Sequence, residues 1–247
     1  MSNRRVLVTG SSRGIGRAIA RKLAADGWSV ALHFTTHEEE ALALKEELGG
    51  RCSGVYRQDL SNSSKAPSLI EEALLDGPLY ALVNNAGVYL PMDFLGSGDS
   101  AFEANLSRTF AINFDSPLRL TRAICKHFQE TGSGKILNVA SRVGFRGEPG
   151  AALYAASKAA LINLTRSLAV ELAPKNIGVF GIAPGWVETA MVRDHMDERL
   201  PSILSTIPLG RMASVDDCAA AAAFLLSEPA SYLSGQVIDI NGASYFH

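Results

Sequence analysis

Tyr154 and Lys158 are the residues in this chain best suited to moving a proton. They stand four residues apart in LYAASKAALINLTRSLAVEL, a stretch whose pattern predicts one helix, so both side chains share a helical face. A phenol titrates at a pH of about 10, and a neighbouring ammonium favours the phenolate and lowers that pKa. We therefore expect an acid or base that works near neutral pH, although the spacing alone also suits an ordinary surface pair.

A glycine-rich turn near the start of the chain is suited to binding a phosphate. Gly10, Gly14 and Gly16 lie in TGSSRGIGRAIARKLA, directly after a predicted strand and at the start of a predicted helix. Glycine lets the backbone approach a pyrophosphate closely, and the helix start offers free amide groups and a positive dipole end. The strand and the helix supply the context that such a motif requires, so we predict a dinucleotide-binding turn rather than a plain tight turn.

Short apolar runs alternate with helical patterns along the whole chain. The strands lack polar alternation, as expected when both faces of a parallel sheet are buried. The pattern predicts an α/β fold, a Rossmann-type doubly wound parallel sheet of about seven strands with helices on both faces. The predicted strands are 6–9, 29–34, 54–57, 80–86, 135–141, 177–183 and 236–240, and the predicted helices lie near 15–26, 37–48, 65–75, 101–130, 151–173 and 214–227.

The sequence shows no linker and no repeat, so we expect a single domain over residues 1–247. The segment near 186–211 is longer than a usual connection and has its own helical pattern, which is typical of insertions that cover a substrate site. The net charge of −2 argues against a nucleic-acid partner. The three cysteines and five histidines show no metal-ligand spacing, so no metal is predicted. No leader or membrane span is apparent, so we expect a cytoplasmic protein.

The glycine spacing, TGxxxGxG, resembles that of the short-chain dehydrogenase/reductase family. The resemblance continues through NNAG at 84–87, PGWVET at 184–189 and the ending SGQVIDINGA. Within the family, the turn sequence, the length and the ending resemble the 3-oxoacyl-(acyl-carrier-protein) reductases. The resemblance implies the following cofactor-binding residues: Gly10, Ser12, Arg13, Gly14, Ile15, Gly16, Thr35, Asp59, Leu60, Asn85, Ala86, Gly87, Tyr154, Lys158, Pro184, Gly185, Val187 and Thr189.

The end of the second predicted strand bears on the choice of cofactor. NAD enzymes place an acidic residue there to bind the ribose hydroxyls, but this chain has Phe34 and Thr35. The acids at 38–40 come later and suit the first turn of the next helix. Arg13 can supply positive charge to a ribose phosphate, unless it is an ordinary solvated loop residue. We predict NADP(H), with NADPH favoured over NADH. By resemblance, Asp59 bonds the adenine edge, with a helix N-cap as the alternative.

The resemblance also assigns the catalytic roles. Tyr154 gives its proton to a substrate carbonyl oxygen as hydride arrives at the carbon, and Lys158 lowers the phenol's pKa and holds the nicotinamide ribose. Ser141 bonds the developing oxyanion, and Asn113 supports a water path to Lys158. Two simpler roles stay open: Ser141 as a strand-end cap, and Asn113 as a helix residue bonded to a local backbone group.

The predicted reaction is therefore NADPH-dependent reduction of a 3-oxoacyl thioester bound to acyl-carrier protein. The alternatives are reduction of another carbonyl, in a polyketide, a sugar or a small ketone, and a non-catalytic nucleotide sensor, which would not need an intact proton relay. The resemblance implies a homotetramer and a carrier-docking lysine, Lys175, near the site mouth. Gly132 stands where the family has its other docking arginine, so either Lys126 and Lys135 substitute for it or docking is weaker. The alternative for all three lysines is that they are ordinary solvated charges.

Overall fold

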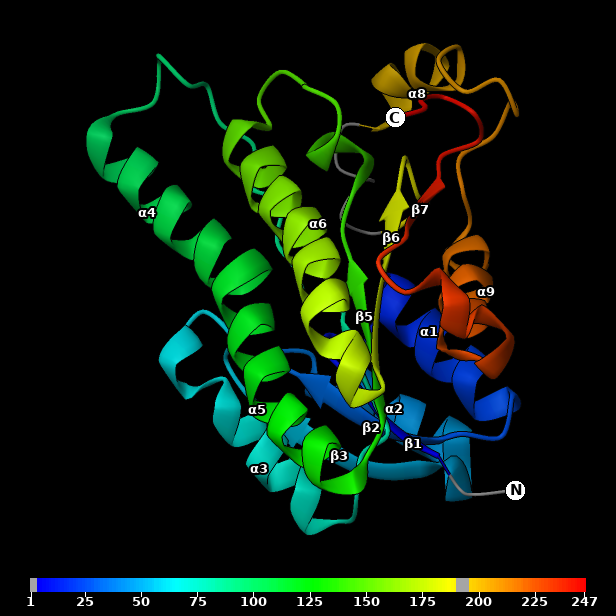
Figure 1. The fold of residues 1–247 in the computed structure, drawn as a ribbon. Helices are drawn as coiled ribbons and strands as arrows, with labels where there is room; N and C mark the ends of the chain where they lie inside the picture. The colour runs from blue at the N-terminus through cyan, green and yellow to red at the C-terminus, as the bar shows by residue number, and fades with distance from the viewer. Residues whose placement is uncertain (1–3, 190–195) are drawn as a thin grey trace.

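The computed structural model describes residues 4–189 and 196–247, and its seven strands form one parallel sheet in the order β3-β2-β1-β4-β5-β6-β7 (Figure 1). This confirms the predicted fold class. The strands are β1 (Arg5–Val8), β2 (Ser29–Phe34), β3 (Cys52–Arg57), β4 (Ala81–Asn84), β5 (Gly134–Val139), β6 (Ile177–Pro184) and β7 (Val237–Ile240).

Helices cover both faces of the sheet. Those described are α1 (Gly14–Ala25), α2 (Glu38–Leu48), α3 (Pro67–Leu75), α4 (Asp99–Phe110), α5 (Ser116–Thr131), α6 (Ala152–Leu172), α8 (Met196–Leu204) and α9 (Val215–Leu226). Successive strand residues point to opposite faces. In β1, Val6 and Val8 pack with α1, α2 and α9, whereas Leu7 packs with α3, α5 and α6. Burial on both faces explains why the strands show no polar alternation.

The strand order places a switch point between β1 and β4. From β1 the chain adds β2 and β3 on one side, then returns to place β4 to β7 on the other (Figure 1). The connections after β1 and β4 therefore leave the sheet in opposite directions, which opens a crevice beyond their carboxyl ends. Ligands of such sheets bind in that crevice.

Most predicted bounds differ from the structure by one or two residues, and two of the differences concern the site. The helix predicted over 101–130 is interrupted by a π-helical turn, Ala111–Asp115, between α4 and α5. Such a turn inserts one extra residue without ending the helix, so apolar spacing does not reveal it. The fifth strand ends at Val139, so Ser141 lies beyond it.

The segment near 186–211 contains α8, in agreement with its helical pattern. Its described part is held by a small apolar cluster in which Ile203, Ile207 and Met212 pack with Trp186. Residues 190–195 of this segment lie outside the described residues, and its role over a substrate stays a prediction.

A chain of buried amide and hydroxyl groups joins the sheet to two helices. The Asn84 Nδ2 atom donates to Thr121 Oγ1 at 3.1 Å and to Asn138 Oδ1 at 2.9 Å, and Asn138 Nδ2 donates to Thr165 Oγ1 at 2.9 Å. Asn84 therefore steadies β4, β5, α5 and α6 beneath the crevice. Among the described helices, none is both long enough and apolar enough to cross a membrane.

Candidate active site

A cleft of about 400 Å³ opens at the switch point, beyond the carboxyl ends of the central strands. It brings together residues from the glycine-rich turn, the ends of β2 and β3, the segment after β4, and the Tyr154 helix. Of the residues predicted from the sequence, all line this cleft except Gly16 and Asn113, which are both buried.

The glycine-rich turn is closed by packing that only glycine allows. A Cβ atom at Gly16 would overlap the Gly10 carbonyl oxygen and the Asn85 amide, and Gly10 itself has a φ of +63°. Asn85 Nδ2 donates to Thr9 O at 2.8 Å and to Gly10 O at 3.1 Å. The turn is thereby tied to the segment after β4.

The start of α1 faces the cleft without a side-chain cap. Its N-cap residue, Arg13, makes no capping hydrogen bond, so no side chain occupies the amide groups of the first turn. Gly14 and Ile15, in that turn, line the cleft. A helix start in this condition fits the pyrophosphate of a dinucleotide.

The end of β2 presents no carboxylate to the cleft. Phe34, Thr35, Thr36 and His37 line it beside Arg13, while the acids at 38–40 are exposed in the first turn of α2, as predicted. Thr35 Oγ1 donates to Gln58 O at 2.9 Å. The lining at the end of β2 therefore holds no acid that would repel a phosphate on an adenosine ribose.

Asp59 is not the N-cap of a described helix, and its role at the adenine edge stays a prediction. It lines the cleft, and its Oδ1 atom accepts a hydrogen bond from Ser61 N at 2.9 Å. That backbone bond is the main reason the pKa of the Asp59 carboxyl is lowered. The carboxylate is therefore fixed and ionised at the adenosine end of the cleft.

Tyr154 and Lys158 share one face of α6, as the spacing predicted. Lys158 Nζ lies 5.7 Å from the centre of the Tyr154 ring and donates to Val139 O at 2.8 Å. Ser141 hydrogen-bonds the Tyr154 phenol, and its Oγ atom also accepts from Val143 N at 3.4 Å. Ser141 thus caps a short turn and also stands beside the phenol.

The expectation that Lys158 lowers the phenol's pKa is wrong in this structure. Burial raises the pKa of Tyr154 to about 12, outweighing the hydrogen bond with Ser141, which acts in the opposite direction. Burial also lowers the pKa of Lys158 to about 8. Loss of water disfavours the charged form of each group. At neutral pH the phenol is therefore protonated and the lysine is still largely an ammonium.

Asn113 lies in the π-helical turn and reaches a backbone segment far from it in sequence. Its Oδ1 atom accepts from Val88 N at 2.9 Å, and its Nδ2 atom donates to Val88 O at 2.9 Å and to Ser157 Oγ at 3.1 Å. A Cβ atom placed on Gly87 would lie 3.3 Å from Asn113 Oδ1 and 3.5 Å from Lys158 Nζ. Asn113 thus fixes the segment beside Lys158, and its part in a water path stays a prediction.

A charged pair near Ser141 and Tyr154 was not predicted from the sequence. The buried Arg142 follows Ser141; its Nη2 atom bonds Glu148 Oε2 at 2.7 Å, and its guanidinium lies 5.6 Å from the Trp186 ring centre. The charge of Glu148 also contributes to the raised pKa of Tyr154. The loop 142–150 therefore places the Glu148 charge within electrostatic reach of Tyr154.

Other lining residues were also missed: His33, His37, Val88, Arg108, Ile112, Val139 and Ala140. Many of them neighbour predicted residues at strand ends, and that adjacency is the signal that could have found them. Within residues 4–189 and 196–247, no group of His, Cys, Asp and Glu side chains could hold a metal ion.

Comparison with known proteins identifies the family. A family model described as enoyl-(acyl carrier protein) reductase matches residues 10–243. The 3-oxoacyl-(acyl-carrier-protein) reductase FabG of Escherichia coli (strain K12) is 37% identical over 244 residues, covering 97% of this chain and 96% of that protein. The chain belongs to the short-chain dehydrogenase/reductase family.

Further relatives of this short-chain dehydrogenase/reductase differ in name. Nodulation protein G of Rhizobium sp. (strain N33) is 39% identical over 244 residues, covering 98% of this chain and 97% of that protein. The structure of a provisionally named NAD(P) dependent gluconate 5-dehydrogenase from Beutenbergia cavernae, with bound NADP at low occupancy, matches with a TM-score of 0.91 at 35% identity, covering 99% and 97% of the two chains. The protein is an oxidoreductase of a family that uses a nicotinamide cofactor, which the open helix start and the glycine-rich turn fit.

The lowered pKa of Lys158 predicts a pH dependence of cofactor binding. The NADPH dissociation constant of the wild-type protein should rise as the pH passes about 8, because the ammonium is lost there. The rise should approach about tenfold for each further pH unit. Lys158→Met should bind NADPH weakly at every pH and show no such rise. Fluorescence titration across neutral and alkaline pH measures the dissociation constant of both proteins. If the two constants depend on pH in the same way, the assignment of Lys158 to cofactor binding is contradicted.

Proposed function

We propose that this short-chain dehydrogenase/reductase reduces a 3-oxoacyl thioester, carried by acyl-carrier protein, to the 3-hydroxyacyl product with NADPH. The observation that carries the proposal is a protonated Tyr154, hydrogen-bonded to Ser141 and next to Lys158, in the same cleft as an open dinucleotide turn. The substrate class is supported by the similarity to the Escherichia coli reductase over nearly the full length of both chains.

The side chains divide the chemistry of a carbonyl reduction. A bound nicotinamide supplies the hydride. The Tyr154 phenol, protonated because burial raises its pKa to about 12, donates its proton to the carbonyl oxygen. Ser141 donates a hydrogen bond to the same oxygen as negative charge develops there. The Lys158 ammonium binds the nicotinamide ribose, and Asn113 holds the segment after β4 beside that lysine.

We propose NADPH over NADH from the wall at the end of β2. No acid stands there to bind the ribose hydroxyls, and Arg13 lies in the same lining. An arginine binds a phosphate group more strongly than a neutral hydroxyl. The Beutenbergia cavernae structure, which contains NADP, supports the same choice.

A polyhydroxylated ketone is the second candidate substrate. The Arg142–Glu148 pair places a guanidinium and a carboxylate beside Tyr154, where an acyl chain would favour apolar groups. Such a pair suits hydroxyl or carboxylate groups on the substrate. The similarity to the Beutenbergia cavernae dehydrogenase, named for gluconate, supports this alternative.

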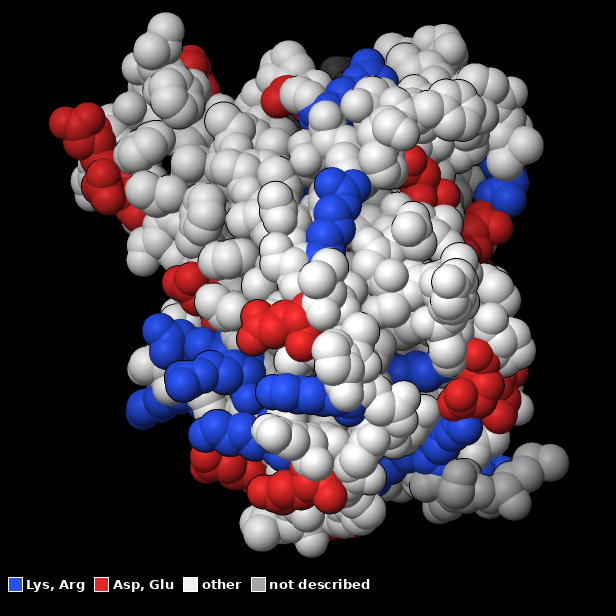
Figure 2. Space-filling model, in the orientation of Figure 1, with Lys and Arg blue, Asp and Glu red and all other residues white. Residues whose placement is uncertain are grey.

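Docking of an acidic carrier needs positive charge near the cleft, and Lys175 does not supply it within one subunit. Lys175 follows α6, whose 21 residues extend roughly 30 Å from the Tyr154 end. Lys126 is exposed on α5, where Figure 2 shows Lys and Arg side chains gathered beside the lower part of the helix. The prediction of Lys175 at the site mouth is therefore wrong for a single subunit.

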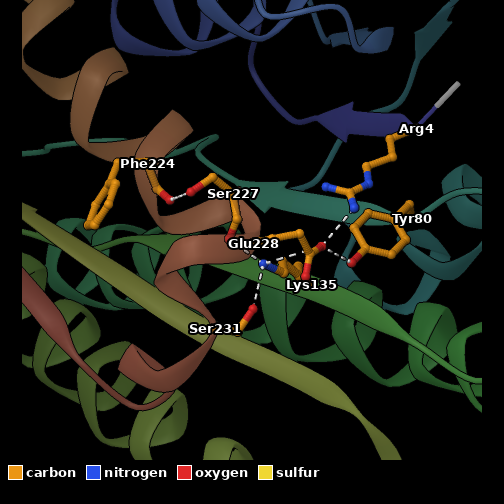
Figure 3. Close-up of polar contacts among 7 residues, drawn as sticks. All are labelled: Arg4, Tyr80, Lys135, Phe224, Ser227, Glu228 and Ser231. Atoms are coloured by element: carbon orange, nitrogen blue, oxygen red, sulfur yellow. Dashed lines mark hydrogen bonds and ion pairs between the residues drawn. The ribbon is translucent and has the colours of Figure 1, made fainter. Parts of the chain in front are cut away.

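Lys135 is also excluded from docking, because it is buried at the amino end of β5. Its Nζ atom donates to the Ser227 carbonyl and the Ser231 hydroxyl and lies 4.0 Å from Glu228 Oε1 (Figure 3). Arg146, in contrast, is exposed in the loop between Ser141 and Tyr154. We assign the docking charge to Arg146.

We also propose a homotetramer, the assembly that the resemblance implies. Val170 on α6, Phe224 on α9 and Tyr232 beyond it are exposed apolar side chains on the described surface. A neighbouring subunit would cover such groups.

Replacing the proton donor tests the reaction. Tyr154→Phe keeps the ring but removes the acid, so turnover should fall on the order of a hundredfold or more, while the NADPH dissociation constant should hardly change. Tyr89→Phe removes the neighbouring phenol, whose ring centre lies 5.1 Å away, and should cost far less. Steady-state kinetics with a 3-oxoacyl thioester measure the turnover of both variants. Near-normal turnover in Tyr154→Phe would contradict the role of Tyr154 as the proton donor.

Replacing the phosphate-facing arginine tests the cofactor choice. Arg13→Ala should weaken NADPH binding roughly tenfold, because a charge-assisted contact is lost, and should leave NADH binding nearly unchanged. Arg17→Ala, one turn along α1 and paired with Glu47, is the matched control and should change neither. Titration of the three proteins with both cofactors decides this. Tighter binding of NADH by the wild-type protein would refute the preference.

Two charge reversals test carrier docking. Arg146→Glu should raise the Michaelis constant several-fold for a carrier-bound 3-oxoacyl thioester but not for a small thioester analogue, and added salt should shrink the difference. Lys175→Glu should change neither constant. An effect confined to Lys175→Glu would move docking to the far end of α6. Activity on polyhydroxylated ketones without activity on 3-oxoacyl thioesters would favour the second candidate.

A further inference from the structure

His33 lies in the lining of the cofactor cleft, and no role there was predicted for it from the sequence. It is the penultimate residue of β2, it is 1% exposed, and it lines the cleft beside Gly10 and Thr35. A buried imidazole needs partners for both ring nitrogens. The identity of those partners shows what the ring does.

The two ring nitrogens bond two different cofactor-facing segments. Gly10 N donates to His33 Nδ1 at 3.0 Å, and His33 Nε2 lies 3.0 Å from the Gln58 carbonyl oxygen. A backbone N–H can only donate and a carbonyl can only accept. The ring is therefore neutral, with its proton on Nε2. Burial lowers the pKa of His33 to about 4, which keeps the ring in this form at neutral pH.

The main chain of His33 strengthens the first of these links. His33 N donates to Ser11 Oγ at 3.0 Å, and Ser11 N donates to His33 O at 3.0 Å. Ser11 is fully buried. The turn at Gly10 and Ser11 is thus attached to the end of β2 through both the backbone and the ring.

The second link reaches residues 58–60, directly after β3, which we call the adenosine wall. Gln58 directly precedes Asp59 and Leu60, which line the cleft, and its carbonyl oxygen also accepts from Thr35 Oγ1. The imidazole therefore spans from the pyrophosphate turn to the segment after β3. A side chain with one polar end, or with none, cannot bond both at once.

We propose that His33 is a positioning residue for the dinucleotide: its neutral ring sets the distance between the pyrophosphate turn and the adenosine wall. Both hydrogen bonds position protein segments that face parts common to NADPH and NADH. Loss of the ring should therefore weaken the two cofactors by the same factor. This separates His33 from Arg13, whose loss should affect NADPH alone.

The test is direct fluorescence titration of purified His33→Leu with NADPH and with NADH, in the absence of substrate. Both dissociation constants should rise on the order of tenfold, because two buried hydrogen bonds are lost, and their ratio should stay at the wild-type value. His33→Asn retains an acceptor for Gly10 N and should recover part of the affinity.

His127→Leu is the matched control. The Nε2 atom of that histidine lies 3.2 Å from Leu79 N and 3.1 Å from Leu79 O, so the ring bonds one of these two backbone groups according to its tautomer, and it lies on α5 outside the cleft lining. The His127→Leu variant should have a lower thermal unfolding midpoint than the wild-type protein, with both dissociation constants unchanged. A merely structural role for His33 would give the same pattern in His33→Leu, which would overturn the proposal.

Two further outcomes also overturn the proposal: a rise in the dissociation constants of His127→Leu equal to that of His33→Leu, and a selective loss of NADPH affinity in His33→Leu. If His33→Leu fails to fold, His33→Asn and His33→Gln carry the test, and wild-type affinities in both overturn it. Because binding is measured without substrate, the result is independent of whether 3-oxoacyl thioesters are reduced.

Discussion

The close approach of the glycine-rich turn to the start of α1 is the constraint on which the site depends. With no side chain at Gly16, the helix packs directly on the Gly10 carbonyl and the Asn85 amide. Thr9 Oγ1 then accepts hydrogen bonds from Asn85 N at 2.9 Å and Ala86 N at 3.0 Å, so the ends of β1 and β4 are joined at the switch point. Any Cβ atom at Gly16 would force these segments apart and would displace the helix start that faces the cleft.

Burial is the largest influence on the charge states of Tyr154 and Lys158. The same loss of water stabilises the neutral phenol of Tyr154 and the neutral amine of Lys158. The Glu148 carboxylate acts in the same direction on the phenol, and its own charge is balanced by Arg142. The result is an acid that holds its proton at neutral pH, which is the state that a carbonyl reduction needs and that the reverse oxidation does not.

The amino ends and the carboxyl ends of the strands carry different kinds of polar group. At the amino ends of the strands, the Arg4 guanidinium lies over the Trp28 and Tyr80 rings. It pairs with Glu228, which also accepts a hydrogen bond from the Tyr80 hydroxyl (Figure 3). These groups satisfy one another and tie the segment after α9 to the residues that directly precede β1 and β4. At the carboxyl ends of the strands, the first turn of α1 has no side-chain cap, and its amides remain open to a ligand. Stability and ligand binding are thus handled at opposite ends of the same strands.

The sequence by itself determined the features that depend on local pattern. Apolar runs buried on both faces indicated every strand of the sheet, the spacing of Tyr154 and Lys158 placed them on one helical face, and the residues ending β2 showed that no acid stands there. Only the tertiary structure decided the rest. The π-helical turn that carries Asn113 leaves no mark on the apolar spacing. The pKa of Tyr154 and the partners of His33 depend on groups brought close by the fold from distant positions in the chain, because desolvation and hydrogen bonding act through space rather than along the sequence.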